Sequence, residues 1–561
     1  MANKKFRRVK KVLTVLAIIP LVLIHLAIIF NLPTIIYLGR TFYTTLDIEG
    51  HQIDIDLTME QKLEDLDYMY EIVCLGNPNK EYLEQLYGIS YDDIYNRYRQ
   101  LVIDSKTDYE YFSIMACFLG VLPGQHNAMM IPNYQQGTSS FLMIEQLASQ
   151  KMRDYAYSWK EAFRDEVLKY REYGIIGFRY MDGKYIGIHS DSTLMKFNNT
   201  YGSAQLLTID GKDPVDLCFD YLLRESVYYD EGNDCFIRRS LYFNDGIGEP
   251  HTAEILMPDG EIVTTTIYEA PGFEIAMADG ISNYPEEIGV PDVSSAPEDE
   301  TSEDSMYPVY HGNTYMITAD PDRNLVYVDC DACDTSEGEK LAEDLTEALA
   351  LSDADYVILD LRSNGGGSTS FCNEQVLPVL FSHDLEYPTE VVGLKNDYTK
   401  RYYNDLYYHY YIGRPLTTDE DHYYVHEDFN VEGRADKDYK IYVLTSRSTF
   451  SSADLMVCLC KEYDNATIVG TNTGGEGICG TPYRCYLPNS HFVFTYTPTS
   501  NTVHPEDTYL GTSPDIYIAS TPEEYYMKMD LYDQGLDYED YEIRQTWDGT
   551  LNYVLDLIDG E

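Results

Sequence analysis

Serine and threonine hydroxyls crowd the stretch LTSRSTFSSADL, residues 444–455. The apolar residues before this stretch predict a strand and the run MVCLC predicts a helix, so Ser451 and Ser452 fall at the turn. A serine at such a turn exposes its hydroxyl at the sheet edge, beside free amides and a helix dipole that stabilise developing negative charge. The alternative is a capping box, Ser451-x-x-Asp454, in which the serine only caps the helix. Both interpretations are open on this stretch alone.

A second loop whose residues could take part in catalysis is DLRSNGGG, residues 360–367. An apolar strand pattern ends at Arg362 and is followed by Asn364 and three glycines, which let the backbone turn tightly and leave amides free to face a ligand. The spacing matches neither of the glycine fingerprints of nucleotide-binding loops. An oxyanion hole and a plain glycine turn therefore remain as the two interpretations.

The helices and strands that carry these loops can be predicted from changes of pattern along the chain. Residues 57 to about 122 have apolar positions at helical spacing, and the helices end at LPGQHN, which leaves His126 in a loop. From about residue 175, short alternating segments separated by turn dipeptides predict strands of a small β-rich module. Strands and helices alternate between 307 and 520, which predicts an α/β core with a mixed sheet.

These patterns divide the chain into six predicted segments. They are a basic tail and membrane anchor (1–40), a helical cap (41–150), the β-rich module (151–280), an acidic linker (281–306), the α/β core (307–520) and a C-terminal helical segment (521–561).

Charge and hydropathy bear on location and partners. The whole chain has a formal charge of −54, although its first forty residues carry seven Lys and Arg and no acid, so the remainder carries −61. A field of this sign repels phosphate backbones, and we expect no nucleic-acid partner. The apolar residues 12–30 are just long enough to span a bilayer, and no cleavage site of the usual small-residue kind follows them. We expect a single-pass signal anchor with the rest of the chain outside the cytoplasm, the alternative being secretion after cleavage.

The eleven cysteines give weaker signals. Cys330-x-x-Cys333 lacks a second pair of ligands, so we expect no structural zinc site there. Cys479 and Cys485 are close enough in the chain to form a local disulfide across a turn, whereas Cys458 and Cys460 lie in an apolar helix pattern typical of buried thiols. No metal cluster or cofactor fingerprint is present in the sequence, and we expect neither a metal nor a cofactor.

Taken together and in order, five motifs resemble the C-terminal processing (tail-specific) peptidases, a family of serine peptidases. The motifs are DLRSNGGG (360–367), STFSSAD (448–454), IVGTNTGGEG (468–477), VFTYTPTSN (493–501) and GTSPDI (511–516). The resemblance covers about 310–520 and implies a crotonase-like core. The predicted helices resemble the family's cap, and the β-rich module stands where many relatives carry a PDZ-like domain.

The resemblance also implies roles for particular residues. Aligning the family's serine-rich turn places the nucleophile at Ser451, and the amides of Gly366 and Ser452 would form the oxyanion hole. The main branch of the family has a lysine 25 residues after the serine, but this chain has Glu476 there, and Lys461 and Lys528 do not match that position.

A tricorn-like arrangement of serine, histidine and acid is therefore expected. The histidine of the cap motif corresponds to His126, with His311 and His504 as competitors. His504 lies close to the acid pair but matches no histidine of the family. The acid falls just before GTSPDI, so Glu506 or Asp507 is the candidate. Glu476 is either a further member of the site or a surface acid.

The leading hypothesis is a membrane-anchored, extracytoplasmic serine endopeptidase that cleaves extended polypeptides through an acyl-enzyme on Ser451. The YTP strand would pair with the substrate backbone. One alternative is a catalytically inactive relative that binds a peptide or a lipophilic ligand in the same cleft. The other is a cell-surface scaffold that binds its partner through the β-rich module.

Overall fold

A computed structural model gives the fold. It describes residues 56–124, 126–129, 159, 162–190, 196–220, 222, 223, 225–273, 275, 307–407, 416–480 and 482–560. The expected anchor at 12–30 and the acidic linker lie outside the described residues, and so does Gln125 beside His126. Within those ranges, the structure has no helix that combines the length and the apolar character needed to cross a membrane.

The α/β core is built on a seven-stranded sheet with the order β10-β11-β12-β13-β17-β18-β22. Its strands are β10 (Val309–His311), β11 (Tyr315–Asp320), β12 (Leu325–Cys330), β13 (Tyr356–Asp360), β17 (Lys440–Thr445), β18 (Ala466–Gly470) and β22 (Ile516–Tyr517). β10, β11 and β12 pair antiparallel, and every pairing from β12 to β22 is parallel. The sheet is therefore mixed, as the sequence predicts.

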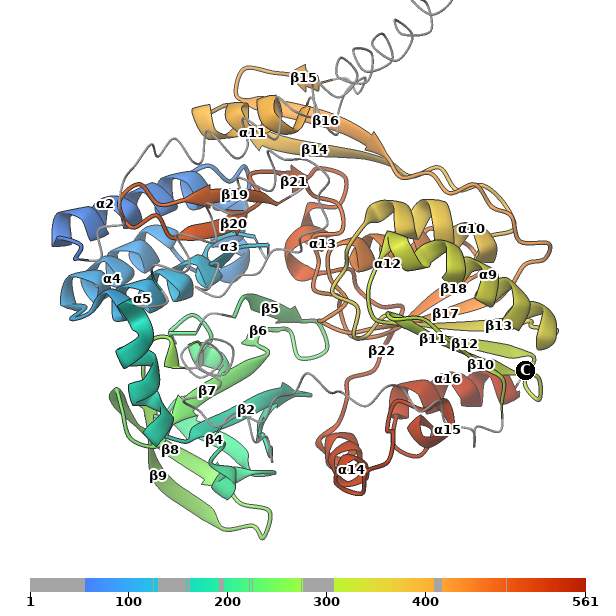
Figure 1. Ribbon diagram of the computed structural model, residues 1–561, viewed down its shortest axis with the longest axis horizontal. Helices are drawn as coiled ribbons and strands as arrows, with labels where there is room; N and C mark the ends of the chain where they lie inside the picture. The colour runs from blue at the N-terminus through green and yellow to red at the C-terminus, as the bar shows by residue number, and fades with distance from the viewer. Residues whose placement is uncertain are drawn as a thin grey trace, which may run out of the picture.

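Both faces of this sheet are covered, which explains why its strands are apolar at nearly every position. Val326 and Val328 face one apolar cluster, and their neighbours Leu325 and Tyr327 face another. The helices on the first face are α9 (Thr335–Leu351), α10 (Leu377–Leu380) and α12 (Ser452–Lys461), and those on the second are α15 (Tyr541–Arg544) and α16 (Gly549–Gly560). Figure 1 shows the two groups on opposite sides of the strands.

The N-terminal helices form a separate body beside the core (Figure 1). They are α2 (Met59–Met69), continued by a π-helical turn at Tyr70–Leu75, then α3 (Lys80–Tyr87), α4 (Tyr91–Asp104) and α5 (Asp108–Val121). The short strand β1 (Ala128–Met129) follows and joins a three-stranded sheet with β20 (Val493–Tyr496) and β19 (Tyr483–Tyr486).

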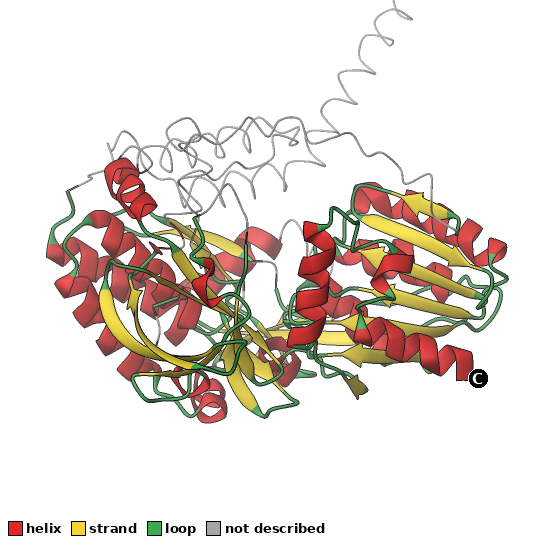
Figure 2. Ribbon diagram, turned by 90° about the horizontal axis from the view of Figure 1, so that it is seen from below, coloured by secondary structure: helices red, strands yellow, loops and turns green. Residues whose placement is uncertain are grey.

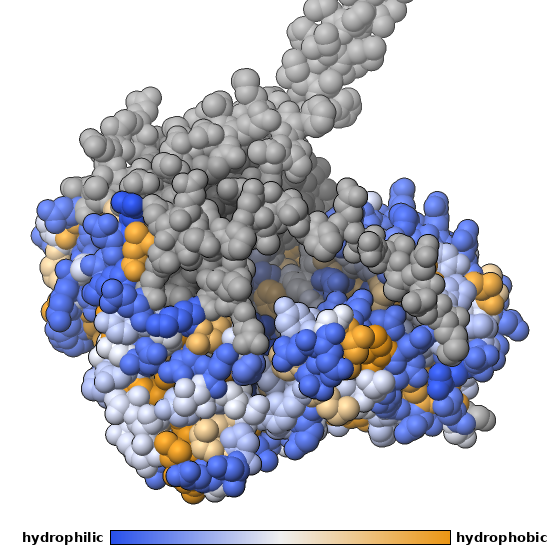
Figure 3. Space-filling view, turned by 60° about the horizontal axis from the view of Figure 1, so that its bottom comes forward, coloured by the Kyte–Doolittle hydropathy of each residue, from blue (hydrophilic) through white to orange (hydrophobic). Residues whose placement is uncertain are grey.

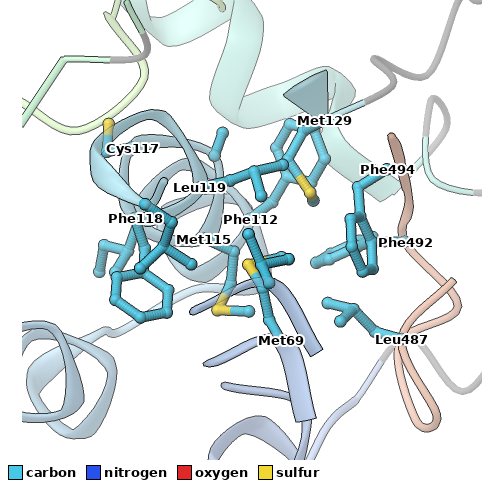
Figure 4. Packing of buried hydrophobic residues seen from close by; sticks show 14 of the residues in the cluster. Met69, Phe112, Met115, Cys117, Phe118, Leu119, Met129, Leu487, Phe492 and Phe494 are labelled. Carbon is cyan, nitrogen blue, oxygen red and sulfur yellow. The ribbon is translucent and has the colours of Figure 1, made fainter. Parts of the chain in front are cut away.

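This pairing ties the cap to distant residues of the chain. Figure 4 shows Met69 and Phe112 of the helices packed towards Leu487, Phe492 and Phe494. Because α5 is buried along nearly its whole length in this cluster, the loop after it, which carries His126, is held against the core.

The β-rich module is a closed barrel of six strands in the order β2-β3-β4-β8-β9-β7. These are β2 (Ile175–Met181), β3 (Lys184–Gly187), β4 (Gln205–Ile209), β7 (Ser240–Asn244), β8 (Glu249–Leu256) and β9 (Ile262–Glu269). A helix at 162–169 precedes the barrel. Outside the barrel, β5 (Val227–Asp230) pairs with β6 (Cys235–Arg238). Figure 2 shows the curved barrel strands on one side of the molecule and the flatter core sheet on the other. The PDZ-like and crotonase-like assignments remain predictions.

The remaining elements complete the surroundings of the core. They are β14 (Pro388–Leu394), α11 (Asp397–Tyr407), β15 (Leu416–Thr418), β16 (His422–Asp428), β21 (Ser500–Asn501), α13 (Pro505–Leu510) and α14 (Pro522–Asp533). On the face shown in Figure 3, hydrophilic residues predominate and apolar side chains are scattered, in keeping with the strongly negative charge.

Candidate active site

Three loops meet at the carboxyl edge of the core sheet. They follow the adjacent parallel strands β13, β17 and β18, whose registers pair Asp360 with Leu444 and Leu444 with Val469. Loops after neighbouring parallel strands begin side by side, and clefts of α/β sheets form at this edge. The glycine loop also contacts the serine turn, because a Cβ on Gly366 would lie only 2.8 Å from the Cβ of Ser451.

Ser451 occupies a sharp turn between β17 and α12. Its backbone has φ 58° and ψ −126°, a conformation that a residue with a Cβ rarely adopts. The turn is held because the Ser451 amide donates to the Gly475 carbonyl at 2.9 Å, and the Leu455 amide donates to the Ser451 carbonyl at 3.0 Å. This strand–turn–helix geometry presents the hydroxyl outward, as in a nucleophile elbow.

The capping-box interpretation of this turn is wrong. The Ser451 side chain makes no capping hydrogen bond. The Asp454 carboxylate is buried and accepts hydrogen bonds from the hydroxyls of Thr473 and Thr512 and, at 2.8 Å, from the Gly477 amide. Burial raises the pKa of this carboxyl, against the effect of those donors. Asp454 therefore joins the first turn of α12 to the loop after β18.

His126 contacts both the serine and a carboxylate. Its Nε2 lies 3.0 Å from the Ser451 Oγ, and its Nδ1 is in direct contact with the Glu476 Oε2. The same carboxylate oxygen accepts the His126 backbone amide at 3.0 Å, and the ring packs 4.7 Å from that of Phe450. The side chains of His126 and Glu476 are 13% and 2% exposed, so the imidazole is held largely away from solvent.

This arrangement sets the direction in which a proton can move. A carboxylate can only accept, so the Nδ1–H donates to Glu476 and the Nε2 lone pair faces the serine hydroxyl. Nε2 can then take the Ser451 proton, and the buried carboxylate stabilises the imidazolium that forms. Serine, histidine and acid are thus placed for nucleophilic catalysis.

The acid at Nδ1 is Glu476, and not Glu506 or Asp507 as expected from the sequence. Those two residues open α13, and within the described ranges no hydrogen bond or ion pair joins either carboxylate to His126. The backbone of α13 instead supports the loop that carries Glu476, since a Cβ on Gly475 would lie 2.8 Å from the Asp507 carbonyl oxygen. Glu476 is 3% exposed, so its interpretation as a surface acid is also wrong.

Of the two amides predicted to form the oxyanion hole, one already donates a hydrogen bond within the described part of the protein and the other does not. The Gly366 amide donates to the Asn364 side-chain oxygen at 2.9 Å and is therefore occupied. The Ser452 amide opens α12 and, among the residues that the structure describes, has no acceptor. The Ser452 hydroxyl donates to the Gly367 carbonyl at 3.0 Å, which holds the glycine loop against the helix.

Residues 324–518 match the family model described as peptidase family S41. This segment belongs to peptidase family S41. The chain is accordingly a serine-type peptidase, and the resemblance to the C-terminal processing peptidases is confirmed. No curated protein matches the chain in sequence.

Solved structures of peptidases are similar to the chain at low identity. Mature CPAF is 15% identical, with a TM-score of 0.47, and the match covers 90% of this chain and 98% of that one. The photosystem II D1 C-terminal processing protease is 13% identical with a TM-score of 0.32, covering 82% and 94%. The tricorn protease is 14% identical with a TM-score of 0.32, covering 90% and 37%.

The S41 core has no lysine beside its serine in the described part of the chain. Lys461 donates to the Ser513 carbonyl at 2.5 Å, and Lys528 packs 4.2 Å from the ring of Tyr538. The competing histidines also lie elsewhere, with His311 at the end of β10 and His504 just before α13.

The thiols near this S41 site were only partly foreseen. None of the eleven cysteines forms a disulfide in the structure, so the expected disulfide between Cys479 and Cys485 is wrong. Cys479 instead places its Sγ 3.7 Å from the His126 Nδ1, and it donates to the Glu476 carbonyl at 3.2 Å. Cys479 follows Glu476 by three residues in the chain, and this spacing could have indicated that the thiol lies near the site. Cys485 is buried in β19.

Proposed function

We propose that the chain is an endopeptidase that hydrolyses extended polypeptides through an acyl-enzyme on Ser451. His126 serves as the general base and Glu476 as the carboxylate that orients it. The observation that carries the proposal is the pair of contacts of one imidazole, 3.0 Å to the Ser451 Oγ and directly to the Glu476 carboxylate. His126 and Ser451 lie 325 residues apart in the chain and meet only in the fold.

The chemistry follows in two half-reactions. His126 takes the hydroxyl proton while Ser451 attacks the peptide carbonyl, and the tetrahedral oxyanion is stabilised by the Ser452 amide and the N-terminus of α12. His126 then gives this proton to the leaving amine, and the acyl-enzyme forms. In the second half, His126 removes a proton from water, the hydroxide attacks the ester, and the proton returns to Ser451.

The substrate is an extended chain that approaches beside His126. The YTP strand, β20, was expected to pair with it, but both of its edges are already paired, with β1 and with β19. β1 begins two residues after His126 and, among the described residues, is one of the two edge strands of this sheet. A substrate backbone adding to β1 would run past the base.

We also propose that the enzyme is anchored in a membrane by its N-terminal segment. Residues 12–30 would form a single-pass anchor, and the basic cluster before them would stay in the cytoplasm, so the peptidase domain would act outside it. Release after signal cleavage is the alternative.

A fluorophosphonate probe tests the serine chemistry without knowledge of the substrate. We expect the full-length protein in mild detergent to be labelled on Ser451, with labelling lost in Ser451→Ala and reduced at least about 100-fold in His126→Ala. Ser448→Ala is the matched control, because it removes a hydroxyl three residues away that lies 3.2 Å from Arg239 and not at His126. A folded protein that takes no label would favour the ligand-binding alternative.

A further inference from the structure

The Nδ1 side of His126 faces Cys479 as well as Glu476. The His126 Nδ1, a Glu476 carboxylate oxygen and the Cys479 Sγ all lie within 4.8 Å of one another. Nitrogen, carboxylate oxygen and thiolate are the three ligand types that Zn²⁺ takes in proteins. The three residues come from two loops that other contacts hold in place. The Thr495 hydroxyl donates to the His126 carbonyl at 2.8 Å, and the Ser451 amide donates to the Gly475 carbonyl at 2.9 Å.

The geometry suits a tetrahedral ion after a small movement. Zinc–ligand bonds of about 2.0–2.3 Å place tetrahedral ligand atoms about 3.3–3.7 Å apart. The Nδ1–Sγ distance is already 3.7 Å, whereas the carboxylate lies closer to Nδ1 than this spacing and must move away from it for an ion to enter. Glu476 can do this by rotating its terminal torsion, which is broad for a carboxylate.

The electrostatics also favour a cation. The Glu476 carboxylate at this site is buried, with 3% of the residue exposed. A divalent ion bound by one carboxylate and one thiolate is locally neutral, and the chain as a whole carries −54. A divalent cation therefore suits the charge of these ligands.

We propose that His126, Glu476 and Cys479 form an inhibitory Zn²⁺ site that switches the peptidase off. The binding part stands alone, and the inhibitory part rests on the proposed function. The ion is a regulator and not a cofactor, so removing metal with a chelator does not lower the activity.

Inhibition follows from the tautomer of one ring. In the active form, Nδ1 carries the proton and Nε2 faces Ser451 with its lone pair. When Zn²⁺ takes the lone pair of Nδ1, the neutral ring must carry its proton on Nε2, where it can no longer accept the serine proton. The ring proton thus moves from one nitrogen to the other, and the Cys479 thiol proton is released to solvent.

Binding is tested first, on the full-length protein. Zn²⁺ is titrated against a chromophoric chelator, and Co²⁺ is used as a spectroscopic substitute whose charge-transfer band reports a thiolate ligand. We expect wild type to bind one more Zn²⁺ per chain than Cys479→Ala, and the Co²⁺ band to be lost in that variant. Cys235→Ala is the matched control, because Cys235 is also half-buried but lies in the β-rich module at β6. Equal stoichiometry or an unchanged band in Cys479→Ala would overturn the proposal.

Inhibition is tested next with the fluorophosphonate probe. We expect saturating Zn²⁺ to slow labelling of wild type and of Cys235→Ala at least about tenfold, with recovery on addition of chelator. For Cys479→Ala, the ratio of rates without and with Zn²⁺ should fall below about two, whatever its own rate. Normal labelling without Zn²⁺ binding would refute the Zn²⁺ site and leave the proposed function intact. Binding of Zn²⁺ by a protein that is never labelled would refute the proposed function and leave the Zn²⁺ site intact.

Discussion

Replacing Glu476 by Gln removes the charge at Nδ1 of His126 with almost no change in shape. In the wild type, one carboxylate oxygen accepts both the Nδ1–H and the His126 backbone amide, and the side chain is 2% exposed. A hydrogen bond to a charged group contributes about 1.5–3 kcal/mol, and each 1.4 kcal/mol is a factor of ten. Losing the charge-assisted bond alone therefore slows the reaction about 10- to 100-fold.

A second effect of Glu476→Gln adds to the first. If the amide nitrogen turns towards His126, it donates to Nδ1 and forces the proton onto Nε2, the wrong tautomer for a base. In a serine triad, the corresponding neutral substitution costs on the order of 10⁴ in kcat. We therefore expect a loss between about 10-fold and about 10⁴-fold, with little change in folding because the two side chains have the same shape.

The assay is the second-order rate of fluorophosphonate labelling between pH 6 and 9, with thermal melting to verify the fold. Glu506→Gln and Asp507→Asn are the matched controls, because they neutralise acids that stand at the start of α13 and not at His126. Both should stay within about threefold of wild type. A loss smaller than threefold for Glu476→Gln, or a larger loss for Glu506→Gln, would refute the assignment of Glu476 as the orienting acid.

Three further predictions test the framework of the site. Gly475→Ala should lower labelling on the order of tenfold. Gly475 has φ +83° and a Cβ would lie 2.7 Å from the Thr508 carbonyl oxygen, so the loop before Glu476 would be displaced. Gly211→Ala is the control and should leave labelling unchanged, because φ is +78° there but nothing lies within 4 Å of the added Cβ. Asp454→Asn should lower the free energy of unfolding by about 1–3 kcal/mol in urea melts. The amide oxygen can still accept from Thr473 and Thr512, but the Gly477 amide, which donates to the other carboxylate oxygen, would face an NH₂ group. An unchanged midpoint would contradict this. Burial raises the pKa of Asp507 to about 7 from 3.8, so the folded state holds a proton that the unfolded state has lost, and stability falls as pH rises from about 4 to 7. Asp507→Asn should remove this part of the pH dependence and be more stable than wild type at pH 8 but not at pH 3.5, and parallel melting curves for the two proteins would disprove it.

The fold of the core could be predicted because its signals are local. Strands such as β12 and β13 are buried on both faces and are apolar at nearly every position, and α12 follows Ser451 as an uninterrupted apolar run. The pairing of β20 with β1 could not be foreseen, since its partner is a two-residue strand about 365 positions earlier. Such a pairing depends on how the cap packs and leaves no periodic pattern in the sequence.

The order of the chemical loops, the serine turn and the absence of a lysine at position 476 can be read from the amino-acid sequence. They follow from residue identity and from the alternation of strands with helices, which places loops after parallel strands at one edge of a sheet. Which acid meets His126, and which interpretation of Ser451 holds, depends on contacts made in the folded chain. Glu476, Glu506 and Asp507 are all carboxylates near the same motifs, and nothing in their local sequence separates the buried acid at the imidazole from those on α13. The distinction arises because the loop after β18 is pinned between α12 and α13, and that contact exists only once the chain is folded.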